Sequence, residues 1–136
     1  MSAAIEALIP HRAPMRFVNE LTASTDTTAT ATTCFRETDF CVADGRVLES
    51  ALVECAAQTV AAALGQRMRA SGNASGGNHG MLAAVSNFRV VSRPPAGQVI
   101  TIEVRELKRL GPMLLVAATL TCAGQTVATG ELSLYA

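Results

Sequence analysis

One stretch restricts the fold of this chain more than any other: residues 47–68 are predicted to form a long helix that is apolar on nearly every face. The stretch is rich in alanine and leucine and contains no glycine or proline before Gly65. A helix that is apolar all round has to be covered all round. A single flat sheet covers only one face, so the sheet must curl or a second subunit must cover the rest.

The remainder of the chain is typical of strands. Residues 16–36 are rich in threonine and valine and predict two strands divided near residues 24–26. A short helix is predicted at residues 3–9, and a loop at residues 37–46 precedes the long helix. Four more strands are predicted between turns that contain proline or glycine, at residues 80–91, 98–107, 113–122 and 125–135. We therefore predict an α+β fold in which an antiparallel six-stranded sheet wraps around one central helix.

Length and charge narrow the class of protein. With 136 residues, the chain fits a single domain, residues 1–136, with one sizeable core. The eleven basic and eleven acidic residues cancel, which argues against nucleic acid as the main partner. No run reaches the roughly 18 apolar residues of a membrane span, and the N-terminus has no basic, apolar targeting pattern. We expect a cytoplasmic protein that does not cross a membrane.

The four cysteines, at positions 34, 41, 55 and 122, form no CxxC pair and lack zinc-site spacing. We therefore expect no metal site, and we interpret these residues as small, buried, reduced thiols.

Ser50, Glu54 and Gln58 follow one another at intervals of four and form one polar stripe on the apolar helix. A carboxyl group buried among apolar side chains is expected to have a raised pKa. Such a group exchanges protons near neutral pH, as general acid–base catalysis requires. Gln58, one turn on, is a candidate to orient the acid, hold a water or contact a substrate. The alternative is a structural acid that faces solvent at the edge of the helix.

Two motifs resemble those of the 3-hydroxyacyl-acyl carrier protein dehydratases. Residues 8–15, Leu-Ile-Pro-His-Arg-Ala-Pro-Met, are similar to the opening of that family, and residues 52–58, Leu-Val-Glu-Cys-Ala-Ala-Gln, are similar to its helix motif. The resemblance implies the hotdog fold, a dimer, and acyl thioesters carried on the phosphopantetheine of acyl carrier protein or coenzyme A, with no other cofactor. It also implies that Glu54 is the catalytic acid.

The histidine that works with this acid in the family is missing, because Phe40 or Cys41 stands at its position. In this respect the chain looks closer to a divergent branch of hotdog dehydratases associated with aryl-polyene pigment synthesis. That branch has a similar opening at residues 10–15 and an Ala-Asp-Gly loop, matched here by residues 43–45.

Several residues are candidates for the second half of the site. Asp44 lies in the loop before the helix, where it either acts in catalysis or caps the helix. His11 lies in the opening motif, whereas His79 and Cys41 are weaker candidates. The backbone N–H groups that follow Gly45, at the expected helix start, are candidates to bind the thioester carbonyl.

The leading functional prediction is a lyase that dehydrates 3-hydroxyacyl chains on acyl carrier protein. One alternative is an acyl-thioester hydrolase that uses Glu54 to activate water. Another is a non-catalytic subunit that completes the site of a hotdog paralogue, so both a homodimer and a heterodimer are expected forms. Arg89 and Arg93 either meet an acidic carrier or lie on a solvated strand face.

Overall fold

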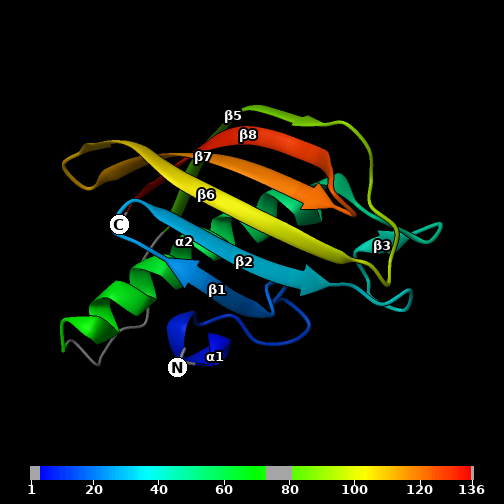
Figure 1. Cartoon of the computed structure of the whole chain (residues 1–136), viewed down its shortest axis with the longest axis horizontal. Helices are drawn as coiled ribbons and strands as arrows, with labels where there is room; N and C mark the ends of the chain where they lie inside the picture. The colour runs from blue at the N-terminus through cyan, green and yellow to red at the C-terminus, as the bar shows by residue number, and fades with distance from the viewer. Residues whose placement is uncertain (1–3, 73–80, 136) are drawn as a thin grey trace.

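The computed structural model describes residues 4–72 and 81–135, which form one curved sheet around a long helix (Figure 1). In chain order the elements are α1 (Ile5–Leu8), β1 (Glu20–Ser24), β2 (Thr28–Cys34), β3 (Val42–Ala43), β4 (Arg46–Val47), α2 (Glu49–Ala70), β5 (Met81–Val90), β6 (Val99–Leu110), β7 (Met113–Cys122) and β8 (Gln125–Tyr135). The six long strands have the order β1-β2-β6-β7-β8-β5, and each neighbouring pair is antiparallel. The predicted fold is therefore confirmed.

The core lies between the concave face of the sheet and α2. Along β6, Ile100, Ile102 and Val104 are buried, and the residues between them are more exposed, as their alternation predicts. Strand β7 alternates in the same way. On the helix, Val53 and Leu64 remain only partly buried, so the sheet covers most but not all of the apolar circumference.

The segment before the helix differs from the prediction. A small hairpin of β3 and β4 occupies part of the expected loop, and Asp44 and Gly45 form its two-residue turn with φ values of 56° and 74°. An Asp-Gly pair favours this turn because both central residues need positive φ. Helix α2 begins only at Glu49, and its N-cap residue, Leu48, provides no side-chain cap. The prediction that Asp44 caps the helix is therefore wrong.

Arg93 fastens this hairpin to the rest of the protein. Its Nε donates to the carbonyl of Val47 at 3.0 Å, and its Nη2 donates to the carbonyls of Ala43 at 2.9 Å and Arg46 at 3.0 Å. The backbone N–H of Val47 in turn donates to the carbonyl of Pro94 at 2.9 Å. Arg93 is thus a structural clamp that lies outside the strands and is partly buried, so its interpretation as part of a solvated strand face is wrong. The contact with an acidic carrier stays a prediction.

Replacing Arg93 by methionine keeps most of the aliphatic stem and removes three hydrogen bonds to carbonyl groups. We expect Arg93→Met to lower the free energy of unfolding by about 2 kcal/mol, allowing for the partial exposure of the side chain. Urea denaturation measures the change. The control, Arg105→Met on the exposed face of β6, should change it by less than about 0.5 kcal/mol. Equal losses of unfolding free energy in the two variants would contradict the role of Arg93 as a clamp.

The two edges of the sheet differ in length and polarity. Strand β1 has five residues, and its exposed positions are mostly polar. Strand β5 has ten residues and exposes Leu82 and Val85. A long edge strand with exposed apolar side chains is a template for pairing with another chain.

Three of the four cysteines, at positions 41, 55 and 122, are buried, whereas Cys34 is exposed, which corrects the prediction for that residue. Burial raises the pKa of the Cys55 thiol and of the Cys41 thiol. Both therefore stay protonated near neutral pH and are poor nucleophiles. Within the described residues, no three His, Cys, Asp or Glu side chains are grouped to hold a metal ion. No helix of the described part is long and apolar enough to cross a bilayer.

Candidate active site

Glu54 lies in the second turn of α2 and faces the segment between α1 and β1. Its side chain is 36% exposed, so the prediction of a buried acid is wrong. One carboxylate oxygen, Oε2, accepts a hydrogen bond from Nε2 of Gln58 at 3.0 Å and lies 3.6 Å from Nε2 of His11. The acid is therefore accessible to a ligand while one of its oxygens is held by its neighbours.

Gln58 is only 1% exposed and makes four hydrogen bonds. Its Nε2 donates to Glu54 and, at 2.8 Å, to the carbonyl of Met15. Its Oε1 accepts from the backbone N–H groups of Phe17 at 2.8 Å and Val18 at 3.2 Å. These bonds use both N–H groups and both lone pairs of the amide. A substrate would have to displace one of them in order to bind Gln58.

His11 belongs to a tightly bonded corner between α1 and β1. Nη1 of Arg12 donates to the carbonyl of Ile9 at 2.9 Å, and Nη2 donates to the carbonyl of Glu6 at 2.9 Å. The N–H of Met15 donates to the carbonyl of Arg12 at 2.8 Å. These bonds fix the backbone on both sides of His11, whose side chain is 32% exposed. Its Nδ1 is buried and has no hydrogen-bond partner within the described chain.

The structure thus brings together three of the residues that the sequence singled out, Glu54, Gln58 and His11. A carboxylate and an imidazole this close can act as a pair that accepts and donates protons. The backbone groups of Met15, Phe17 and Val18 are also part of the arrangement. No property of those side chains predicts a role for the backbone, so sequence reasoning missed it.

The other candidates lie elsewhere or in other environments. Asp44 is exposed at the hairpin turn, and the carbonyl of Gly45 accepts from the N–H of Ala96 at 2.9 Å. Cys41 is buried with a protonated thiol, while Phe40 beside it is 60% exposed and its ring centroid lies 5.8 Å from that of Phe17. Ser50, the first residue of the polar stripe, is exposed. His79 lies outside the described residues.

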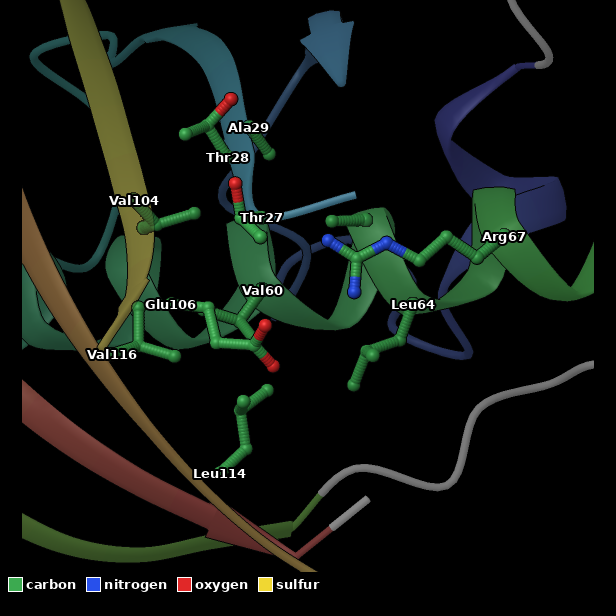
Figure 2. A pocket seen from close by; sticks show the side chains of 11 residues that line it. Thr27, Thr28, Ala29, Val60, Leu64, Arg67, Val104, Glu106, Leu114 and Val116 are labelled. Atoms are coloured by element: carbon green, nitrogen blue, oxygen red, sulfur yellow. The ribbon is translucent and has the colours of Figure 1, made fainter. Parts of the chain in front are cut away.

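A groove adjoins the segment that Gln58 holds, and a small cavity lies between the helix and the sheet. A groove of about 790 Å³ runs between residues 13–19 and residues 34–41 and includes Phe17, which Gln58 holds. A cavity of about 20 Å³ lies on another face of α2, where Val60 and Leu64 face β6 and β7 (Figure 2). The second cavity has room for only one or two water molecules. The groove is therefore the roomier hollow near the site.

Comparisons with known proteins agree with this fold. The family model described as ApeP-like, ApeP dehydratase, matches residues 3–136. No curated protein matches the chain.

Among solved structures, the dehydratase heterocomplex ApeI:P from Xenorhabdus doucetiae matches with a TM-score of 0.89 and 19% identity, over 99% of this chain and 91% of that one. A hypothetical thioesterase with coenzyme A from Streptococcus pneumoniae matches with a TM-score of 0.67 and 14% identity, over 85% and 83%. The Escherichia coli PaaI protein matches with a TM-score of 0.69 and 12% identity, over 86% and 82%. At these identities the structures show a shared fold.

Proposed function

Because the chain belongs to the ApeP-like dehydratase family, we propose that it dehydrates 3-hydroxyacyl thioesters, with Glu54 and His11 as the reacting pair. The observation that carries this proposal is the distance of 3.6 Å between Nε2 of His11 and Oε2 of Glu54. Phe40 or Cys41 stands at the position of the histidine that the 3-hydroxyacyl-acyl carrier protein dehydratases use, and His11 supplies an imidazole from another part of the same chain.

The reaction needs one group that accepts a proton and one that donates a proton. In the proposed cycle, the Glu54 carboxylate takes the α-proton of the thioester, and the electron pair of the broken C–H bond forms the new double bond. The 3-hydroxyl group leaves as water after it receives a proton from the imidazolium of His11. Transfer of the proton from Glu54 back to His11 restores the starting state, and the closeness of the two groups favours this step.

The acyl chain is proposed to arrive as a thioester on the phosphopantetheine of acyl carrier protein or coenzyme A, with aryl-polyene precursors as the substrate class. The first turn of α2 is a candidate to bind the thioester carbonyl, because its N–H groups lack a side-chain cap at Leu48. This replaces the expectation that the carbonyl binds directly after Gly45.

The assay that tests this function follows enoyl absorbance and free thiol together, with 3-hydroxyacyl thioesters of carrier protein and of coenzyme A. Enoyl formation without thiol release supports the dehydratase. Thiol release instead supports the alternative of a hydrolase on the same scaffold. Reversal, the hydration of an enoyl thioester, provides an independent check because an enzyme catalyses both directions.

A second proposal concerns the partner. The similar structure from Xenorhabdus doucetiae is a dehydratase heterocomplex, which favours a hotdog paralogue as the partner of this chain, with a homodimer as the alternative. Strand β5 is the candidate contact, because it is the longer edge of the sheet and exposes Leu82 and Val85. If activity appears only with a paralogue, the chain acts as a complementing subunit.

A charge at this edge should prevent pairing. We expect Val85→Glu to shift the protein from dimer to monomer in analytical ultracentrifugation, alone and after mixing with the paralogue, because a carboxylate in an apolar interface is costly to desolvate. The control is Leu110→Glu, at an exposed position at the end of β6 remote from β5 in the strand order. Retention of the dimer in Val85→Glu would place the interface elsewhere.

A further inference from the structure

Gln58 contacts both halves of the proposed pair. We propose that Gln58 is a positioning residue that holds Glu54 and the segment bearing His11 in one arrangement, leaving Oε1 of Glu54 free to react with the substrate. This inference rests on the proposed function of the Glu54–His11 pair. It assigns to Gln58 a role in aligning the catalytic groups rather than in binding the substrate.

The pattern of partners requires an amide at position 58. Two N–H donors meet two acceptors, the Met15 carbonyl and Glu54 Oε2, and one oxygen meets two donors, the N–H groups of Phe17 and Val18. Turning the amide over would set oxygen against oxygen and nitrogen against N–H at all four contacts. The surroundings therefore fix the orientation of the amide, and with it the position of the N–H that reaches Glu54.

The two oxygens of Glu54 are consequently not equivalent. Oε2 accepts the bond from Gln58 and lies beside His11, whereas Oε1 has no hydrogen bond within the described chain. Besides His11, the buried thiol of Cys55 is close enough to Glu54 to interact with it electrostatically. Oε1 is therefore the oxygen that remains available for the α-proton of a substrate.

Gln58 also fixes the segment on which His11 lies. The bonds to Met15, Phe17 and Val18 anchor one end of that segment. The bonds of Arg12 to the carbonyls of Glu6 and Ile9 stiffen the other end. A displacement of Met15 is thus transmitted along a short, bonded backbone to His11.

Two substitutions separate positioning from simple packing. Gln58→Glu keeps an oxygen acceptor for Phe17 and Val18, but it sets a carboxylate oxygen against Glu54 and the Met15 carbonyl. Gln58→Met keeps the approximate shape and removes all four bonds. We expect each to lower kcat by about 100-fold and to change KM by less than about threefold, because misplacement by about 1 Å has costs of that order.

Thr59→Val is the matched control. Thr59 is fully buried in the same turn of α2, and its hydroxyl donates only to the carbonyl of Cys55, at 2.8 Å. We expect kcat within about twofold of the unmodified protein. A large rise in KM with unchanged kcat in Gln58→Glu would instead assign Gln58 to substrate binding and overturn the inference.

A double-mutant cycle tests the coupling to His11. In a His11→Asn background, the effect of Gln58→Glu should shrink from about 100-fold to below about 10-fold, because the pair that Gln58 aligns is already broken. The same fold loss in both backgrounds means that Gln58 does not act through His11, and the inference fails.

A measurement that needs no catalytic turnover tests this inference independently of the proposed function. In NMR spectra, Glu54→Gln should shift the side-chain amide signals of Gln58 and the backbone amide signals of Phe17 and Val18, even if no thioester is dehydrated. This measurement needs no variant at position 58 and so is unaffected if such variants fold poorly. Unchanged signals overturn the inference, whereas shifted signals without any dehydration overturn the proposed function alone.

Discussion

Replacement of Glu54 by glutamine is expected to lower kcat for dehydration by about a thousandfold, while the protein remains folded. Glutamine keeps the shape and an oxygen acceptor for Gln58, but it cannot take up a proton from carbon. General acid–base groups contribute factors of about 10² to 10⁴ to enzymatic rates. The measurement is the initial rate of enoyl formation, taken with the protein alone and with its hotdog paralogue.

The control is Glu103→Gln, which removes an exposed carboxylate on β6 and should change kcat by less than about twofold. An unchanged rate in Glu54→Gln would falsify the assignment of the acid. If only the mixture with the paralogue is active and Glu54→Gln does not slow it, the catalytic residues belong to the paralogue. In that case the chain is a complementing subunit.

Replacement of Gly65 by alanine is expected to lower the free energy of unfolding by about 3 kcal/mol. Inside an ordinary helix the same change gains about 1 kcal/mol, because alanine has the higher helix propensity. Here an added Cβ would lie 2.2 Å from the carbonyl oxygen of Leu8 and 3.0 Å from its carbonyl carbon, too close for any rotamer to relieve. The clash is with backbone atoms, so α1 or α2 has to move.

Thermal and urea unfolding measure this loss, and Ser50→Ala provides the comparison. Ser50 is exposed on α2, so alanine there should be neutral or slightly stabilising. Because α1 leads directly into the segment that bears His11, Gly65→Ala should also lower kcat at temperatures where the protein is still folded. A gain of stability in Gly65→Ala would mean that the close approach of α1 to α2 is absent in solution.

Much of the fold follows from periodicity and turn chemistry. The alternation in residues 98–107 predicts the strand that β6 forms, and the long run of alanine and leucine predicts α2 to within two residues at each end. These patterns predict the elements because each pattern describes a single helix or strand whose apolar side faces the core. The order of the strands in the sheet could not be predicted from the sequence, because it depends on contacts between distant segments.

The site was predictable in its residues but not in its arrangement. Glu54 stood out because it interrupts an apolar helix, and His11 stood out through its motif, yet nothing in the sequence indicates that they are neighbours. The prediction of a buried acid failed because the polar stripe faces the border between the helix and the segment after α1. Asp44 and Gly45 were misleading, because a pair that favours a hairpin turn also resembles the start of a helix.

The four bonds of Gln58 have a consequence for the order in which the protein assembles. Three of them join residues 40 to 43 positions apart, so closing this loop costs conformational entropy before any contact within it is gained. The segment that bears His11 must therefore wait for the central helix, and His11 meets Glu54 only when the two ends of that loop have met. Catalytic competence would then be among the last properties that the folding chain acquires.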